Sequence, residues 1–342
     1  MEKTLFIGID FSKKTFDVSV IHRNNLQIGD YQQFENSKEG CLRLLQWLKA
    51  LSKTASESWL FCGEHTGLYS ICLSEFLVKK GFFIWLENPL QIKQSNGIKR
   101  DKNDRLDSYD IALYAYRFQD KAIAWCLPEK ALKSLELLLA FRARLLSNKH
   151  TLLISSSEIR RVMQRNATAR YIYEQSKKDI ERINKEIKEV EKRMLEQIKC
   201  DEALRENYEL VSSIKGVALI NTTAILVATQ NFTRFKNSRQ FACYAGMAPF
   251  GKQSGTSLHT KPRVSRLADK NIKVLLTQAA KCAIRHDPDI RLYYERKLAE
   301  GKNKWLITNN IKNKLIHRIF AVVKNKELYQ VDYTIFSNRA IA

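Results

Sequence analysis

The sequence predicts an α/β domain built around a mixed sheet, then a long helical arm, then a compact domain that is mostly helical. Three observations lead to this prediction. Strand-like and helix-like segments alternate over residues 1–125, a heptad-like apolar repeat follows after Tyr173, and glycine and proline separate helical segments in the remainder. With 342 residues, 44% of them hydrophobic, the chain can bury two or three separate cores.

Three strands are expected to open the first domain. The apolar run Leu5–Ile9 and its partner Thr15–Ile21 predict a hairpin, and a third strand is expected near residues 26–34. Asn36 and Ser37 suit the N-cap of the next helix, because their side chains can accept hydrogen bonds from its first free backbone amides. The apolar face of that helix comprises Leu44, Leu45, Leu48 and Leu51.

The remainder of this domain alternates strand and helix. An apolar strand at residues 59–62 precedes a helix at 68–80. A strand at residues 82–86 ends before Pro89, and a final helix begins near Asp104. Three strands in a row followed by this alternation are typical of a mixed sheet covered by helices.

The middle of the chain predicts a helical arm. Its apolar residues recur at alternating intervals of three and four, as in a coiled-coil seam, and charged residues lie between them. No glycine or proline interrupts the segment from Leu132 to Lys215. We expect an antiparallel hairpin or a dimer stalk, with a solvated helix packed on its own domain as the alternative. The seam consists of Ile180, Ile183, Ile187, Val190, Met194 and Ile198.

The C-terminal part predicts a compact group of helices. Gly216 separates two helical stretches, and another helix ends at Gly246. Two further helices are expected at residues 271–284 and 307–323.

The charge balance predicts a polyanionic partner. Lys and Arg number 58 and Asp and Glu number 36, a net charge of +22, which favours nucleic acid over a membrane surface. No apolar run is long enough to span a bilayer, and no signal-peptide pattern opens the chain. The seven cysteines lie singly, which argues against structural zinc and a disulfide framework. We therefore expect a cytoplasmic, nucleoid-associated protein.

Four carboxylates form a candidate metal site. Asp10 ends the first strand and Glu64 ends the strand at residues 59–62, and these two strands are expected to be neighbours. Asp104 and Asp107 lie three residues apart and share a helix face. If that helix packs at the same sheet edge, the four groups repel one another unless divalent cations bind. Oxygen ligands suit Mg²⁺ or Mn²⁺ in a two-metal site for phosphoryl transfer.

The same residues also allow a structural interpretation. Asp10 has the basic turn Lys13-Lys14 behind it as an ion-pair partner, and Glu64 has His65. The helix aspartates could instead cap the helix or interact with its N-terminal dipole. Spacing alone does not choose among four aspartates that recur every three residues: Asp101, Asp104, Asp107 and Asp110.

The segment at residues 251–266 is expected to be a basic loop around Ser254. Cations near an exposed serine would hold a scissile phosphate and stabilise the charge that develops during attack by the hydroxyl. His259 is the nearest histidine in sequence, and a flexible phosphate-binding loop is the alternative. The basic residues of this segment are Lys252, Lys261, Arg263 and Arg266.

Two turns are further candidates for nucleic-acid contact. The sequence IKGV, with Lys215 and Gly216, resembles a helix-hairpin-helix turn whose backbone amides can bind phosphate, although an ordinary glycine at a helix C-terminus also explains it. Lys13 and Lys14 form the second basic turn.

Motifs along nearly the whole chain, from about residue 3 to 325, resemble those of the insertion-sequence one-ten family of transposases, which includes the Piv-type DNA invertases. Jointly they are specific, although no single one is. In order, they are IGIDFSKKTFDV, EHTGLY, ENPLQIKQ, KNDRLDSYDIALYA, IKGV with TTAILVAT, FKNSRQFACYAGMAPFGKQSG and RLADKNIKVLL.

The resemblance implies a fold and a site. Residues 1–130 would form a RuvC-like, RNase H-fold domain with a DEDD carboxylate set, 131–205 a helical coiled-coil arm, 206–328 a helical transposase domain with a serine loop, and 329–342 a tail. By motif, the DEDD set would be Asp10, Glu64, Asp104 and Asp107, and the serine of QSG would be Ser254. The chain departs from the family pattern at one turn: many relatives have a Lys-Arg-Gly-Asn-like turn where this chain has SRLADK.

The resemblance also implies an activity. Such a recombinase, guided by a structured RNA, would act on element ends and target DNA as a homo-oligomer, a dimer or a tetramer. Ser254 would form a phosphoserine link with DNA, assisted by Mg²⁺ on the carboxylates. The alternatives are a RuvC-like junction nuclease that hydrolyses with water and a non-catalytic nucleic-acid scaffold. An actin-like sugar kinase also opens with GID, but 12 glycines in 342 residues and a charge of +22 do not suit it.

Overall fold

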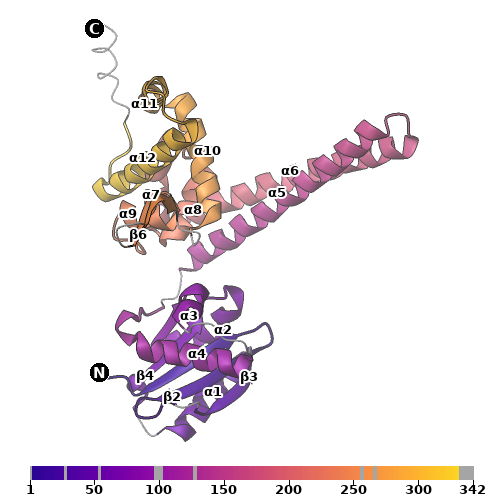
Figure 1. Cartoon of the computed structure of the whole chain (residues 1–342). Coiled ribbons are helices and arrows are strands. Elements are labelled where there is room, and N and C mark those ends of the chain that lie inside the picture. The colour runs from indigo at the N-terminus through magenta and orange to yellow at the C-terminus, as the bar shows by residue number, and fades with distance from the viewer. Residues whose placement is uncertain are drawn as a thin grey trace. The chain divides into compact units, whose positions relative to one another are not determined.

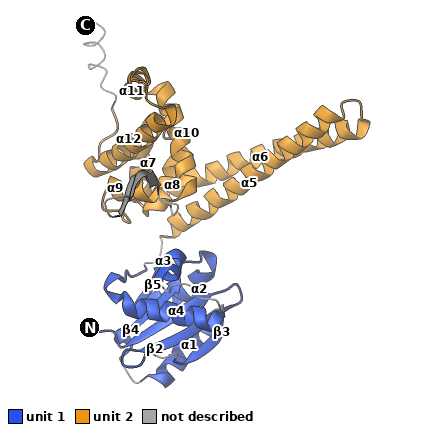
Figure 2. Ribbon diagram, viewed as in Figure 1, with its two compact units in different colours: residues 1–127 blue, residues 128–342 orange. Residues whose placement is uncertain are grey.

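The structure is a computed structural model that describes residues 2–26, 29–52, 55–95, 103–125, 129–254, 258–264 and 268–330, the backbone alone at 249–254 and 258–264. The chain divides into two compact units, residues 1–127 and 128–342 (Figure 2). Each unit has hydrophobic cores of its own.

A five-stranded mixed sheet forms the centre of the first unit (Figure 1). Its order is β3-β2-β1-β4-β5, with β2 antiparallel to β1 and β3, and with β4 and β5 parallel to β1. The predicted mixed sheet is confirmed, and its arrangement fits an RNase H-like α/β fold. The strands are β1 (Leu5–Phe11), β2 (Thr15–His22), β3 (Tyr31–Glu35), β4 (Trp59–Glu64) and β5 (Ile84–Glu87).

Helices cover both faces of this sheet. One face packs on α1 (Lys38–Leu51) and α2 (Leu68–Lys79), and the other packs on α3 (Pro89–Ser95) and α4 (Asp104–Arg117). Ser37 caps α1 as predicted, since its hydroxyl accepts a hydrogen bond of 3.2 Å from the Gly40 amide. Two short 3-10 helices complete the described elements of the unit, at Ser56–Ser58 and Gln119–Lys121.

Helix α4 approaches β1 so closely that their backbones touch. A Cβ atom added to Gly8 would lie 2.1 Å from the Ser108 carbonyl oxygen and 2.2 Å from the Ala112 nitrogen. The buried hydroxyls of Ser19 and Ser108 are 2.8 Å apart and join β2 to the same helix. These contacts fix the first turns of α4 over the C-terminal end of β1.

The helical arm is an antiparallel hairpin of α5 (Lys130–Val162) and α6 (Ala167–Lys199) (Figure 1). Each helix has 33 residues, which corresponds to about 50 Å at 1.5 Å per residue. The predicted seam packs against α5 through residues such as Leu135 and Leu145. Ile180 is half-buried, and the buried members of the seam are Ile183, Ile187, Val190, Met194 and Ile198.

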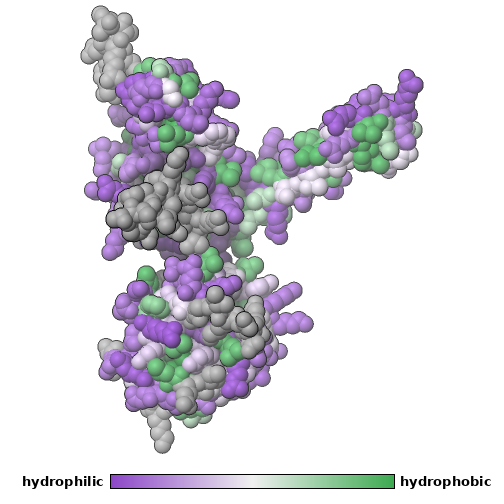
Figure 3. All heavy atoms as spheres, viewed as in Figure 1, coloured by the Kyte–Doolittle hydropathy of each residue, from purple (hydrophilic) through white to green (hydrophobic). Residues whose placement is uncertain are grey.

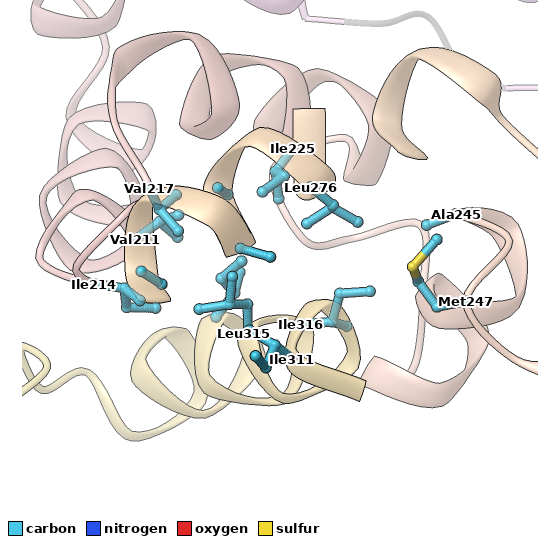
Figure 4. Close-up of a cluster of buried hydrophobic side chains, with 14 of the residues drawn as sticks. Val211, Ile214, Val217, Ile225, Ala245, Met247, Leu276, Ile311, Leu315 and Ile316 are labelled. Carbon is cyan, nitrogen blue, oxygen red and sulfur yellow. The ribbon is translucent and has the colours of Figure 1, made fainter. Parts of the chain in front are cut away.

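The compact part of the second unit is mostly helical, as predicted. Figure 4 shows its core, in which Ile225, Leu276 and Leu315 meet from three different helices. Within the described part of the chain, none of the helices is long and apolar enough to cross a membrane. The helices are α7 (Glu202–Ser212), α8 (Leu219–Thr229), α9 (Ser238–Tyr244), α10 (Lys270–His286), α11 (Pro288–Ala299) and α12 (Lys304–Asn325).

The prediction of a loop at residues 251–266 is wrong about the local structure. The chain there forms a two-stranded antiparallel sheet of β6 (Pro249–Ser254) and β7 (Leu258–Val264). Ser254, the last residue of β6, pairs with Leu258. Backbone hydrogen bonding produces this hairpin without the apolar alternation that usually indicates strands, which is why the sequence did not predict it.

Candidate functional site

Three aspartates converge in the first unit. Asp10, Asp104 and Asp107 each place one carboxylate oxygen within 4.8 Å of the other two. Asp10 lies near the end of β1, whereas the other two belong to the first turn of α4. Asp10 and Asp107 are partly buried and Asp104 is exposed. The group is therefore open to solvent on one side.

The alternation of side chains along β1 explains why Asp10 faces α4. Phe6 packs in the core beneath α4 and Gly8 touches the helix backbone, so Asp10 is the next residue on that face. Asn103 caps α4, because its side-chain oxygen accepts a hydrogen bond of 2.9 Å from the Arg105 amide. The helix therefore begins beside Asp10, and its first turn supplies the other two carboxylates.

Asp10 lies in an unfavourable environment for a negative charge. Burial raises its pKa from the ordinary value of 3.8 to about 7, and the charges of Glu64, Asp107, Asp104 and Asp17 add to the effect in that order. A divalent cation would remove this repulsion, and a donor set made only of carboxylate oxygens suits Mg²⁺ or Mn²⁺. The residues present thus fit a divalent metal ion.

Glu64 faces the same side of the sheet as Asp10. Its strand neighbour Cys62 packs in the core beneath α4, and β4 runs parallel to β1 beside it. Among the described residues, the 4.8 Å group does not include Glu64, although its charge is the first of the neighbouring charges that raise the pKa of Asp10. Glu64 therefore lies near the three aspartates but outside their tight cluster.

Asp17 is a fifth carboxylate at this edge, and the sequence analysis did not single it out. It lies opposite Asp10 in the β1–β2 register and is 2% exposed. Its Oδ1 accepts hydrogen bonds from the Tyr31 hydroxyl at 2.5 Å and from Gln33 Nε2 at 3.1 Å. Burial and this hydrogen bond raise the pKa of Tyr31 to about 12. The register of the β1–β2 hairpin, which places Asp17 opposite Asp10, is what reveals this carboxylate.

Glu87 is a sixth carboxylate on the same sheet face. It pairs with Glu64 in the β4–β5 register, at the end of its strand. Its Oε2 accepts a hydrogen bond of 3.2 Å from the Tyr114 hydroxyl, and its Oε1 one of 2.6 Å from the Asn88 amide. Like Asp10 and Glu64, it ends an apolar strand, so the same sequence signal would have found it.

The aspartate repeat of the sequence contains two further residues, Asp101 and Asp110. Asp110 is buried within α4 and does not belong to the 4.8 Å group of described residues. Asp101 lies outside the described residues.

The predicted nucleic-acid contacts are distributed over both units. Lys13 and Lys14 are exposed in the β1–β2 turn, and Lys215 is exposed between α7 and α8. Gly216 has φ +92°, and a Cβ there would lie 2.6 Å from the Ala279 carbonyl oxygen, so close packing against α10 by itself requires glycine.

The serine segment is described by its backbone. Ser254 and Lys252 lie in β6, whereas Lys261 and Arg263 lie in β7, and Arg266 is outside the described residues. The strand register places Lys252 opposite Thr260 and Arg263 opposite Phe250.

Comparisons with known proteins give one consistent result. Residues 7–159 match a family model of DEDD transposases of the IS110 type, described as "Transposase". Residues 208–295 match the "Transposase IS116/IS110/IS902 family". The two matched ranges cover the candidate metal site and the serine hairpin.

Individual relatives agree with these matches. The pilin gene-inverting proteins of Moraxella bovis and Moraxella lacunata are each 26% identical over 328 residues, which is 95% of this chain and 97% of theirs. A 43.6 kDa protein of insertion element IS110 from Streptomyces coelicolor, described as uncharacterized, is 29% identical over 121 residues, which cover 35% of this chain and 30% of that protein.

Proposed function

The chain belongs to the IS110 family of transposases, and from this premise we propose that it cuts and rejoins the DNA of a mobile element through a phosphoserine intermediate. The observation that carries the proposal is the convergence of Asp10, Asp104 and Asp107 at one edge of the sheet. A cluster of like charges is costly in the free protein and suits a site for phosphoryl transfer.

Four carboxylates would hold the metal. We assign this role to Asp10, Asp104 and Asp107, with Glu64 beside them as the fourth member of the DEDD set. Mg²⁺ or Mn²⁺ bound there would supply Lewis-acid stabilisation of phosphoryl oxygens. Asp17 and Glu87 accept hydrogen bonds from tyrosine hydroxyls instead, so we assign them the role of holding the sheet edge in shape.

Ser254 is the proposed nucleophile. Its hydroxyl oxygen would attack a DNA phosphorus atom and form a P–O bond, while the bond from that phosphorus to a sugar oxygen breaks. The serine proton leaves, and the released sugar oxygen takes up a proton. Because the new ester keeps the bond energy, a second sugar hydroxyl can reverse the step and rejoin strands without ATP. Its place at the end of β6, in a strand pair rich in basic residues, supports this assignment.

DNA and a structured guide RNA are the proposed partners. The net charge of +22 suits both, and two relatives of nearly equal length are named as gene-inverting proteins. A homo-oligomer, a dimer or a tetramer, would bring several strands to be cut into one complex. Figure 3 shows hydrophobic residues along the arm. Among the exposed large side chains of α5 and α6 are Leu153, Val162 and Tyr171, which we propose as contacts with a second copy.

Metal dependence tests the carboxylate assignment. Cleavage of DNA that carries the element ends should require Mg²⁺ or Mn²⁺ and stop on addition of EDTA. The variant Asp107→Asn should lose cleavage by at least about 100-fold while it still binds DNA, because it loses charge but not shape. Asp120→Asn, an exposed aspartate outside the cluster, is the control and should cleave normally. Cleavage by Asp107→Asn at the rate of the control would contradict the assignment.

Co-purifying RNA tests the guide. The protein should be expressed together with its whole element, and the bound RNA should be recovered and sequenced. We expect one structured RNA derived from the ends of the element. Recovery of only random cellular RNA would contradict the RNA-guided part of the proposal and leave the DNA chemistry to be tested separately.

A further inference from the structure

Lys312 of α12 is a buried lysine in the core of the second unit. It is 7% exposed and follows Ile311, one of the core residues that Figure 4 shows. Its Nζ donates a hydrogen bond of 3.2 Å to the Thr277 hydroxyl of α10. An ammonium group has three donors, and this hydroxyl is the one acceptor that the described residues offer it.

The buried ammonium has no counter-ion among the described residues. No ion pair with a described carboxylate forms at Lys312, and the neighbouring charge is another cation, Lys273 of α10. Burial and then this like charge lower the pKa of Lys312. The Thr277 hydroxyl in turn donates to the backbone carbonyl of Lys273, one turn earlier on α10, at 2.8 Å, so Lys312 contacts α10 one turn from Lys273. A buried cation of this kind is costly unless an anion joins it.

The pair lies at the base of the serine hairpin. Asn309, three residues before Lys312 on α12, donates a hydrogen bond of 3.3 Å to the Met247 carbonyl, and β6 begins two residues later at Pro249. The adjoining segment 249–267 contains no Asp or Glu, so it cannot supply a counter-ion. It adds four cationic residues instead, Lys252, Lys261, Arg263 and Arg266.

We propose that Lys312 and Lys273 bind one backbone phosphate of a nucleic acid at the base of the serine hairpin. The inference rests on the proposed function only in taking a nucleic acid as the source of the phosphate. A phosphodiester supplies the missing negative charge and acceptor oxygens for the ammonium donors. Lys273 is partly exposed, and the flexible lysine stem lets the Lys312 ammonium move towards a phosphate that arrives on the α10 side.

A salt titration of binding tests this site with three variants. Lys312→Met and Lys273→Gln each remove one charge of the pair. Lys297→Met is the matched control, because the Lys297 ammonium already pairs with Glu300 at 2.7 Å. The probes are a mixed-sequence DNA duplex and a single-stranded RNA of the same sequence, each bound over a range of ionic strength.

One lost phosphate contact has a defined signature. In both test variants, the slope of log affinity against log salt should become shallower, by about 0.9 on duplex DNA or about 0.7 on a single strand, and affinity should fall roughly tenfold. The control should match the unaltered protein. If the salt slope becomes shallower only for the duplex, the phosphate belongs to DNA. If it becomes shallower only for the single strand, the phosphate belongs to RNA. Unchanged slopes on both probes would overturn the proposal.

Thermal unfolding without nucleic acid separates binding from structure. Lys312→Met should keep or raise Tm, because methionine retains much of the packing and removes an unpaired buried charge. A lower Tm with unchanged salt slopes would mean that Lys312 only supports the core, which would overturn the proposal. If Lys312→Met does not fold, the partly exposed Lys273→Gln decides by the same slopes. No cleavage is measured, so these outcomes are independent of the role of Ser254.

Discussion

Asp10 links the stability of the first unit to pH. Its pKa in the folded chain is raised to about 7 by burial and by the neighbouring carboxylates, so the folded state binds this proton more tightly than the unfolded state. The folded state therefore loses stability as pH rises from about 3.8 towards about 7. A bound divalent cation favours the carboxylate and works in the opposite direction.

The variant Asp10→Asn tests this linkage. With EDTA present at pH 8, the Tm of this variant should exceed that of the unaltered protein. The difference should correspond to about 1 kcal/mol in the free energy of unfolding, a value reduced for the partial exposure of Asp10 to solvent. At pH 5 the difference should be clearly smaller, and near pH 3.5 it should vanish, since Asp10 is then mostly neutral in both the folded and the unfolded chain. Adding Mg²⁺ at pH 8 should stabilise only the unaltered protein. The same Tm difference at all three pH values would contradict the account.

Sequence signals found part of this site because carboxylates at strand ends are visible without a structure. Asp10 and Glu64 were found in this way, and the motif pattern rather than spacing selected Asp104 and Asp107. Asp17 needed the strand register, in which it lies opposite Asp10. The distances between the carboxylates depend on how α4 packs against the sheet. The sequence does not specify this packing, so it could not predict that Glu64 lies outside the tight cluster of described residues.

At the scale of elements, the contact between β1 and α4 sets the geometry of the site. Gly8 lets the backbone of α4 rest on β1, and Asp10 lies two residues further along the same face. Because a Cβ at Gly8 would meet backbone atoms of α4, neither a rotamer change nor a flexible side chain can make room for it. The position of Asp104 and Asp107 thus depends on a glycine outside the cluster.

We predict that Gly8→Ala is severely destabilising. The clash with α4 should cost roughly 3 kcal/mol or more and should abolish stabilisation by Mg²⁺, because α4 must move away from Asp10. Gly81→Ala is the control in the same unit, since a Cβ there has open space and only its φ of +81° is unfavourable, at about 1–2 kcal/mol. Chemical denaturation measures both. A smaller loss for Gly8→Ala than for Gly81→Ala would refute this interpretation of the helix contact.

The sequence predicted the longer elements and missed two short helices. The strands of the sheet and helices such as α1 and α10 have clear periodicity and caps. The missed helices α3 and α11 both begin with proline after an N-cap residue. The Asn88 and Asp287 side chains accept hydrogen bonds from backbone amides two residues on. Pro89 was interpreted only as the end of a strand, although it also begins the next helix.

At the scale of the whole molecule, the charge excess should govern nucleic-acid binding. The described ion pairs engage a small part of the 58 lysines and arginines, and most of these pairs are solvent-exposed. Many cations are therefore available for phosphate contacts, and each contact releases counterions on binding.

Affinity should consequently fall steeply with salt. Between 50 and 200 mM salt, binding to element-end DNA should weaken by at least about 100-fold, as several phosphate contacts require. Fluorescence anisotropy with labelled DNA measures this dependence. Affinity that stays flat across this range would mean that the basic residues serve internal contacts instead.

The composition of one active site, from a single copy or from several, can be tested by mixing variants. The carboxylates and Ser254 lie in different compact units of the chain. If the two groups come from different copies in an oligomer, a mixture of Asp10→Asn and Ser254→Ala proteins should regain part of the cleavage activity that each lacks alone. Failure of the mixture to cleave would indicate that one chain supplies both groups.

The most direct test of the account is a denaturing gel of end-labelled element DNA after incubation with the protein, its RNA and Mg²⁺. The unaltered protein should yield a covalent protein–DNA adduct that protease removes, whereas Ser254→Ala should bind DNA and yield none. Thr256→Ala, a hydroxyl residue of the same segment, is the control and should still form the adduct. An adduct that persists in Ser254→Ala, or cleaved DNA without any adduct in the unaltered protein, would contradict the phosphoserine mechanism.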